Sequence, residues 1–191
     1  IAQSYATGRV SGTSNVGGLV GYGWGTIAQS YAAGAVSGVS EVGGLAGYYA
    51  GSITQSYAAG AVTGASNVGG LVGSTWGDIT RSYATGAVSG ISQVGGLVGY
   101  NGGYITESYA TGPVSGTANV GGLVGNNDNG DTDSVLLSYW DSYSTGQAAG
   151  IGAGTAPSGL TAVTSDPAQS AATNYAFKRS AYGNFDFTDG N

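Results

Sequence analysis

The amino-acid sequence predicts an all-β fold, a right-handed parallel β-solenoid (β-helix) of 26-residue coils with an irregular C-terminal cap. Two landmarks recur at this spacing five times without insertion or deletion, which is the signature of a repeat architecture. The first landmark is a tyrosine: Tyr5, Tyr31, Tyr57, Tyr83 and Tyr109. The second is a Gly-Gly-Leu block, which begins at Gly17, Gly43, Gly69, Gly95 and Gly121.

The glycines of the repeat favour strands over helices. Six positions are glycine in each of the first four copies, and in the third copy they are Gly60, Gly64, Gly69, Gly70, Gly73 and Gly77. A helix would lose about 1 kcal/mol at each such position, and a disordered linker would not keep Ile, Val and Leu at fixed positions. Short apolar stretches between glycines therefore indicate strands joined by tight turns.

The third copy, residues 53–78, shows how one coil is expected to fold. We predict three short strands, around residues 55–58, 61–63 and 68–73. Glycine at each corner would supply a positive φ without steric cost. Coils stacked at the strand spacing of about 4.8 Å would give a rod about 25–30 Å long.

Small apolar residues are expected to line the narrow interior of the coil. The best candidates in the third copy are Ile53, Ala58, Val62, Val68 and Leu71. Because side chains alternate along a strand, an inward Ala58 also places Ser56 inside and Tyr57 outside. We expect Ser56 and its equivalents to hydrogen-bond along the stack. The variable position of Gln55, which is Arg81 and Glu107 in the following copies, is expected on the surface with an ion pair between those two.

The repeat decays towards the C-terminus, which predicts a second segment with a different role. Residues 1–125 form the five-coil array, and residues 126–191 supply an insertion loop, a partial sixth coil and a cap. The insertion lies at residues 126–133, and residues 137–140 repeat the Ser-Tyr motif four residues late. A cap is expected because a bare final coil exposes core and an open strand edge. Residues 135–187 are the candidate, with one short helix near 167–172.

Composition excludes several function classes. The chain has no Cys and no His, so disulfides, thiolate metal sites and histidine-based catalysis are excluded. Four basic residues and a net charge of −6 do not make a phosphate-binding stripe, so no nucleic-acid partner is expected. No apolar run approaches the ~20 residues of a membrane span. Ile1 is already in register with Ile27, so we expect a mature piece or a fragment of something longer.

Ser-Tyr-Ala-Thr-Gly-x-Val-Ser-Gly followed by Val-Gly-Gly-Leu-Val-Gly resembles the GLUG-motif repeat over residues 1–125. Residues 138–147 look like the Tyr-Trp-Asp block that follows such arrays, and residues 182–187 look like a closing motif. The resemblance implies a filamentous-haemagglutinin-like adhesin, exported by two-partner secretion and located outside the bacterium or at its surface. The same repeat also occurs beside the catalytic domain of some immunoglobulin A peptidases. The family's cysteine before the tyrosine is Ser here.

Carboxylates are the only groups left for catalysis, and they do not form a site in the repeat. Glu41, Asp78 and Glu107 occupy three different positions of the coil, whereas carboxylate catalysis needs two acids that converge. We therefore expect no enzyme and no required cofactor. One weak metal site is open: Asp128, Asp131 and Asp133 lie in a loop rich in oxygen ligands and could bind Ca²⁺. The loop lacks the Gly and Glu of an EF-hand, so a solvated insertion is the other reading.

Aromatic residues gather in the loop after each Gly-Gly-Leu block and form the candidate binding site. The residues are Trp24, Trp76, Tyr22, Tyr48 and Tyr100, with Tyr49 and Tyr104 beside them. Trp24 and Trp76 share a column two coils apart, roughly 10 Å at the strand spacing. Such a strip could stack on successive sugars of a glycan. Alternatively, the rings cover a solenoid corner or pack on a neighbouring chain.

The leading hypothesis is a structural, non-enzymatic segment of a secreted bacterial surface adhesin. A glycan-binding module, contacting a host or bacterial surface polysaccharide or receptor, is the second. Ice binding is the third, because Ser11, Ser37, Thr63, Ser89 and Ser115 form an outward row. Self-association into filaments through unpaired strand edges at the solenoid ends is the fourth.

Overall fold

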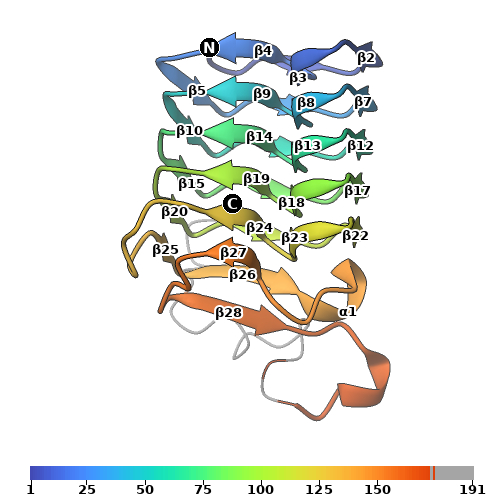
Figure 1. Ribbon diagram of the computed structural model, residues 1–191, viewed down its shortest axis with the longest axis vertical. Coiled ribbons are helices and arrows are strands. Elements are labelled where there is room, and N and C mark those ends of the chain that lie inside the picture. The colour runs from blue at the N-terminus through green and yellow to red at the C-terminus, as the bar shows by residue number, and fades with distance from the viewer. Residues whose placement is uncertain (173, 175–191) are drawn as a thin grey trace.

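The computed structural model describes residues 1–172 and 174, and it forms a parallel β-solenoid of stacked rungs (Figure 1). Equivalent residues pair in register from rung to rung: Tyr57 pairs with Tyr31 on one side and with Tyr83 on the other. The predicted period and the predicted fold class are therefore confirmed. Within the described residues no helix is long and apolar enough to cross a membrane.

Five parallel sheets run along the rod, and each is named here by its first strand. The β1 sheet contains β1 (Tyr5–Ala6), β6 (Tyr31–Ala32), β11 (Tyr57–Ala58), β16 (Tyr83–Ala84), β21 (Tyr109–Ala110), β26 (Ser138–Asp141) and β28 (Leu160–Val163). The β2 sheet contains β2 (Val10–Ser11), β7 (Val36–Ser37), β12 (Val62–Thr63), β17 (Val88–Ser89) and β22 (Val114–Ser115). The β3 sheet contains β3 (Ser14–Gly17), β8 (Ser40–Gly43), β13 (Ser66–Gly69), β18 (Ser92–Gly95) and β23 (Ala118–Gly121).

The other two sheets complete each rung. The β4 sheet contains β4 (Val20–Gly23), β9 (Ala46–Tyr49), β14 (Val72–Thr75), β19 (Val98–Asn101), β24 (Val124–Asn127) and β27 (Ile151–Gly154). The β5 sheet contains β5 (Thr26–Ala28), β10 (Ser52–Thr54), β15 (Ile79–Thr80), β20 (Ile105–Thr106) and β25 (Val135–Leu136). Two short helical segments, α1 (Ser142–Thr145) and η1 (Pro167–Gln169), lie in the C-terminal part.

The rung has five short strands, so the prediction of three was wrong in number. The predicted strand at 68–73 is divided into β13 and β14 by a turn at Gly70 and Leu71. The predicted strand at 55–58 is confined to β11, because Gln55 has a left-handed φ of 47°. The predicted strand at 61–63 corresponds to β12. Ile53 lies in a further strand, β10.

The predicted role of glycine at the corners was also wrong. In the five-rung array the positive φ angles belong to two columns of polar or charged residues, represented in the third rung by Gln55 and Asn67. Within the array only Gly25 among the glycines has a positive φ. The glycine columns serve close packing instead: a Cβ on Gly70 would overlap the carbonyl oxygen of Gly96 and lie 2.8 Å from the Ala84 Cβ. Real Cβ atoms essentially never show such contacts.

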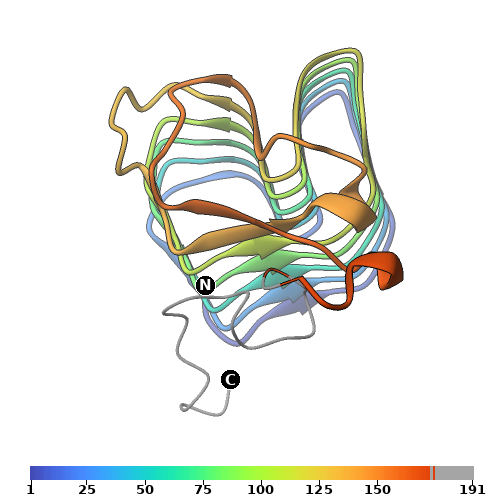
Figure 2. The same cartoon turned by 90° about the horizontal axis from the view of Figure 1, so that it is seen from below.

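The inward columns were predicted correctly, and they form two separate cores. Ile53, Ala58 and Leu71 are buried in a mixed core of mainly Ile, Leu, Ala and Val side chains, whereas Val62 and Val68 belong to a core made of valine alone. Figure 2 shows the rung in cross-section as a broad lobe and a narrow one. The narrow lobe, bounded by the β2 and β3 sheets, holds the valine core.

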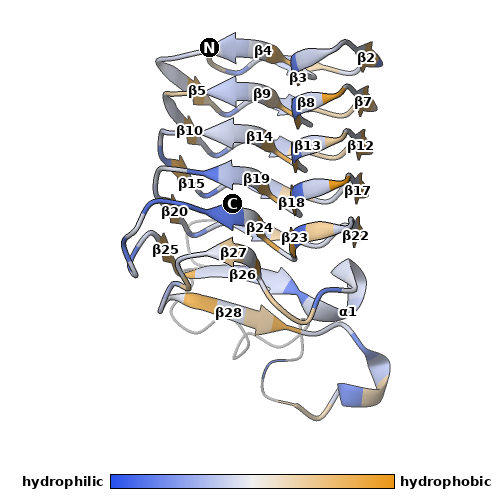
Figure 3. Cartoon of the chain, in the orientation of Figure 1, coloured by the Kyte–Doolittle hydropathy of each residue, from blue (hydrophilic) through white to orange (hydrophobic). Residues whose placement is uncertain are grey.

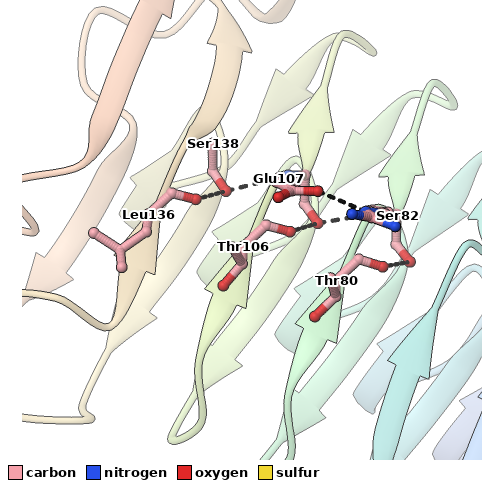
Figure 4. Close-up of polar contacts among 8 residues, drawn as sticks. Thr80, Ser82, Thr106, Glu107, Leu136 and Ser138 are labelled. Carbon is pink, nitrogen blue, oxygen red and sulfur yellow. Dashed lines mark hydrogen bonds and ion pairs between the residues drawn. The ribbon is translucent and has the colours of Figure 1, made fainter. Parts of the chain in front are cut away.

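The predicted serine column is buried and bonded along the stack. Ser56 is 1% exposed, and its hydroxyl accepts a hydrogen bond from the backbone N–H of Ser30, 3.1 Å away. The same hydroxyl donates to the carbonyl of Thr54 in its own rung at 2.8 Å. Figure 4 shows the same pattern further along, where the Ser82 and Ser138 hydroxyls donate to the carbonyls of Thr80 and Leu136. Each serine therefore satisfies the backbone at a corner that lacks a regular strand.

The described part of the C-terminal segment covers the end of the array. β25, β26 and β27 add a partial sixth rung, offset by the insertion so that Tyr109 pairs with Tyr139. Trp140 is 7% exposed and lies over Gly122, whose Cβ would come 2.8 Å from the indole Cγ. Its indole N–H donates to the carbonyl of Gln147 at 2.9 Å. β28, strongly apolar in Figure 3, forms the last described strand beyond β26.

The β2 sheet ends at the fifth rung, where the cap supplies a side chain. Gln147 donates its amide N–H to the carbonyl of Val114 in β22 at 2.9 Å. Asp141 caps α1 by accepting bonds from the backbone N–H groups of Tyr143 and Ser144. The helix expected near 167–172 is the single 3₁₀ turn η1. The predicted closing motif at 182–187 lies outside the described residues.

Candidate functional site

The predicted aromatic residues do not all lie in a loop, because Tyr22, Tyr48 and Tyr100 belong to the strands β4, β9 and β19 of the β4 sheet. Trp24 and Trp76 each come directly after a strand of this sheet, β4 and β14, in equivalent positions two rungs apart. Trp24 is 76% exposed and Trp76 is 54% exposed. Both indoles are therefore on the surface and available to a partner, as the glycan hypothesis requires.

The aromatic side chains form two clusters, where one strip was expected. In the first, Tyr22 stacks on Tyr48 with ring centroids 5.0 Å apart, and Trp24 meets Tyr22 edge-on at 6.3 Å. In the second, Trp76 and Tyr100 lie 5.7 Å apart with an interplanar angle of 51°. Ser74 occupies the position between Tyr48 and Tyr100. The surface thus offers two aromatic patches along the rod, separated at the rung where the small, buried Ser74 takes the place of an aromatic residue.

Glycine shapes the second patch. A Cβ on Gly102 would lie 2.8 Å from the Cζ3 atom of Trp76, so this indole leans along the rod onto the next rung. A side chain at position 102 would displace it. The sequence signal for this contact was present, because Gly102 stands one period after Trp76 where the equivalent residue in the second rung is Ala50.

Tyr49 is not part of the surface, although it was grouped with the aromatic loop. It is 2% exposed, and its hydroxyl donates to the carbonyl of Trp24 at 3.2 Å. Burial raises the pKa of its phenol. The signal missed was alternation along β9, which turns Tyr48 outward and Tyr49 into a buried column with Thr75, Asn101 and Asn127. Tyr49 therefore supports the backbone under Trp24.

The candidate calcium residues are spread along the insertion, and each carboxylate accepts a different hydrogen bond. The Tyr100 hydroxyl donates to Asp128, the Tyr104 hydroxyl donates to Asp131 at 3.2 Å, and Ser158 donates to Asp133 at 3.1 Å. Among the described residues, no three acidic side chains gather into a group that could hold a metal ion. Calcium binding stays a prediction without geometric support here.

These hydrogen bonds to carboxylates raise the pKa of the two tyrosine hydroxyls. The hydrogen bond to Asp128, with smaller contributions from burial and from the charge of Asp128, raises the pKa of Tyr100 to about 12. The hydrogen bond to Asp131 likewise raises the pKa of Tyr104. Both phenols stay protonated at neutral pH and tie the insertion to the fourth rung.

Two predicted surface features are confirmed. Arg81 and Glu107 form an ion pair one rung apart, with 2.7 Å between Nε and Oε2. The tyrosine column faces outward as a ladder of stacked rings, in which Tyr57 and Tyr83 have centroids 4.9 Å apart. The exposed Arg81–Glu107 ion pair is expected to contribute little to stability.

The outward serine row considered for ice binding occupies the second residue of each strand of the β2 sheet. Thr63 pairs with Ser37 and Ser89 on either side, and Ser11 and Ser115 complete the row. It is a single row of short hydroxyls. Ice binding and self-association through the solenoid ends both stay predictions.

Comparison with known protein families finds one match. Residues 64–89 and residues 90–115 each match the GLUG motif. No curated protein and no solved structure matches the chain. Each matched stretch covers one full period of the solenoid, from the turn before the β3-sheet strand to the β2-sheet strand of the next rung. The chain therefore contains GLUG motifs within residues 64–115, and each of them spans one turn of this solenoid.

Proposed function

We propose that this chain is a non-enzymatic structural segment of a secreted bacterial surface adhesin. The observation that carries the proposal is the in-register repetition of one rung, since Tyr57, Val62 and Val68 each pair with their own equivalents on both sides. Such a rod lengthens by the same increment with each added copy. A segment of this kind holds other binding regions at a distance from the cell.

Cell-surface display is the first test. Antibodies raised against the purified chain should label intact, unpermeabilised cells of the source bacterium, and external protease should remove the labelling. Antibody to a cytoplasmic protein provides the control for cell integrity. Labelling that needs lysis would overturn the adhesin assignment and leave the repeat rod standing.

A glycan-binding module is the second candidate, and the exposure of Trp24 and Trp76 favours it. An indole face supplies most of the apolar contact that a sugar ring can use. Replacing Trp24 or Trp76 with Ala should abolish binding to immobilised polysaccharide or whole cells. Stability should change by less than about 0.5 kcal/mol, because exposed rings add little to the core.

Ile91→Ala is the matched control for the glycan test. Ile91 is 59% exposed but lies between β17 and β18, away from the aromatic clusters. It should retain all binding. If both tryptophan variants bind as well as the wild type, the aromatic clusters are not a glycan site. If a tryptophan variant loses stability first, its ring has a structural role.

A further inference from the structure

The outward tyrosine column forms a ladder of rings in direct contact. Successive rings lie almost parallel, with interplanar angles from 9° at the first pair to 2° at the last and centroids from 5.3 to 4.9 Å apart. The members are Tyr5, Tyr31, Tyr57, Tyr83 and Tyr109. Tyr5 is 66% exposed and the other four are partly exposed. The ladder is therefore both continuous and open to solvent.

This geometry suits the chemistry of oxidised phenols. A phenol that loses one electron also loses its hydroxyl proton, and the resulting phenoxyl radical has unpaired electron density on the ring carbons beside the C–O carbon. Two such radicals join through these carbons when the rings can meet. In the ladder, every ring has a phenol neighbour about one rung away, and exposed side chains reorient within nanoseconds.

We propose that the tyrosine ladder is a site of oxidative cross-linking, in which phenols one rung apart become joined as dityrosine. One C–C bond forms between the ring carbons beside the two hydroxyl-bearing carbons, and one C–H bond breaks on each ring. The pair loses two electrons and two protons and both hydroxyls are restored. Hydrogen peroxide, acting through a haem peroxidase, accepts the two electrons and two protons and becomes two molecules of water.

Most other described tyrosines lack this arrangement. The hydroxyls of Tyr100 and Tyr104 donate to carboxylates, and Tyr49 is buried. Tyr22 and Tyr48 form a stacked pair outside the ladder, at 5.0 Å. Cross-linking should therefore concentrate in the ladder, with Tyr22–Tyr48 as a separate product.

Each cross-link would join residues 26 positions apart, such as Tyr57 and Tyr83. A covalent bond that closes such a loop restricts the unfolded chain, as a disulfide does. This chain has no cysteine, so the ladder would provide covalent reinforcement between rungs by another route. The oxidised protein should unfold at a higher temperature than the untreated protein.

The positions of the Lys and Arg residues allow a tryptic digest to show which tyrosines are cross-linked. Arg9 and Arg81 are the only Lys or Arg residues before Lys178, so digestion of the unfolded protein gives fragments 1–9, 10–81 and 82–178. A Tyr57–Tyr83 bond joins the second fragment to the third. A Tyr5–Tyr31 bond joins the first fragment to the second. Bonds such as Tyr22–Tyr48 stay within one fragment and do not interfere.

The experiment treats dilute purified protein with a haem peroxidase and hydrogen peroxide, isolates the monomer band, digests it and measures fragment masses. The wild type should give a 10–81/82–178 conjugate that is lighter by two hydrogens than its parts. Tyr83→Phe should reduce this conjugate to background, since a phenyl ring forms no phenoxyl radical. Tyr109→Phe, the matched control, removes a ladder hydroxyl but leaves Tyr57 and Tyr83, so the conjugate should persist.

Two results would overturn the proposal. One is the absence of the conjugate in the wild type under conditions that couple free N-acetyltyrosine. The other is a conjugate that survives in Tyr83→Phe, which would mean that coupling does not require ladder phenols one rung apart. Because Tyr→Phe retains the ring and its stacking, both variants should fold, and circular dichroism of each checks this.

Discussion

Each rung changes direction at two kinds of corner. One has a glycine without a left-handed φ, and the other has a larger residue with a left-handed φ. Between β13 and β14 the chain turns at Gly70, which has no left-handed φ. Between β10 and β11 it turns at Gln55, which has a φ of 47° and is not glycine. The first corner lies against the next rung, where a Cβ would overlap the backbone of Gly96. The second faces solvent, where Gln55 is exposed.

Glycine at the first corner therefore marks contact between rungs. At the left-handed corner the backbone bears a local strain of about 1–2 kcal/mol, and the side chain lies on the surface, where it contacts its equivalent in the next rung in the pairs Gln3–Gln29 and Arg81–Glu107. The residues there are Gln3, Gln29, Gln55, Arg81, Glu107 and Leu137. At the glycine corner the backbone is relaxed, but no other residue fits. Glycine is thus repeated where the backbones of neighbouring rungs touch, whereas the residue varies at the left-handed corner on the surface.

The largest test of this comparison is Gly70→Ala. The added Cβ meets the backbone of the next rung, which cannot yield as a flexible side chain would. We expect a loss of at least about 3 kcal/mol in the free energy of unfolding, the upper range for overpacking. Gly8→Ala is the control, because nothing lies within 4 Å of a Cβ there. Equal effects in chemical denaturation would refute the packing explanation.

A second test removes side-chain volume at the same corner. Leu71 is fully buried, with 0% exposure, beside the glycine pair. Leu71→Ala should cost about 2–5 kcal/mol through lost burial and a cavity, and the damage should extend to both neighbouring rungs. A loss below about 0.5 kcal/mol in urea denaturation would contradict its place in the core.

A third test concerns the hydrogen bonds that the Asp141 carboxylate accepts in the cap. Burial by itself would raise the pKa of Asp141, but hydrogen bonds from Ser165 and Ser144 outweigh it and lower the pKa below 3.8. A lowered folded-state pKa means that the stabilisation is present above the ordinary value and disappears as the pH falls through the folded one.

Asp141→Asn should therefore flatten the loss of stability that occurs as the pH falls below the ordinary pKa of an aspartate, about 4. It should cost about 1–3 kcal/mol at pH 7, because a charged acceptor of several hydrogen bonds is replaced by a neutral one. Thermal unfolding as a function of pH measures both effects. Asp166→Asn, at the exposed turn η1, is a matched control. An unchanged pH profile in Asp141→Asn would show that this carboxylate does not anchor the cap.

The smallest expected effect is at the left-handed corner itself. Gln55→Gly relieves a strain of about 1 kcal/mol, but glycine adds about 0.5–1 kcal/mol of chain entropy to the unfolded state. The two nearly cancel, so stability should change by less than about 1 kcal/mol in either direction. Calorimetry that found a loss above about 2 kcal/mol would show that the Gln55 side chain supports its rung.

Much of the array could be predicted from the sequence, because stacking forces equivalent residues into equivalent environments. The inward placement of Ile53, Val62 and Leu71, the buried Ser56 and the outward Tyr57 all followed from the period and from alternation. What could not be predicted was the reason for the repeated glycine, since a turn and a close contact leave the same pattern. For the same reason the number of strands in a rung was predicted wrongly.

The candidate site was predictable in position but not in detail. Trp24 and Trp76 are exposed where expected. The orientation of Tyr49 was missed because two adjacent tyrosines obscure which one alternates inward. The division into two clusters depends on Ser74 and Gly102, whose effect appears only once neighbouring rungs are in register.

The rung-to-rung hydrogen bonds also determine how this molecule would respond to mechanical load. The backbone N–H of Ser56 donates to the hydroxyl of Ser82, 26 residues further on, and most other backbone bonds likewise cross to an adjacent rung. Pulling on the chain ends would therefore break these bonds a few at a time, rung after rung. Each lost rung would release about 90 Å of extended chain. Because the rungs are nearly identical, each would unfold at a similar force. The chain would therefore lengthen in regular steps, and the maximum force that it transmits would stay limited.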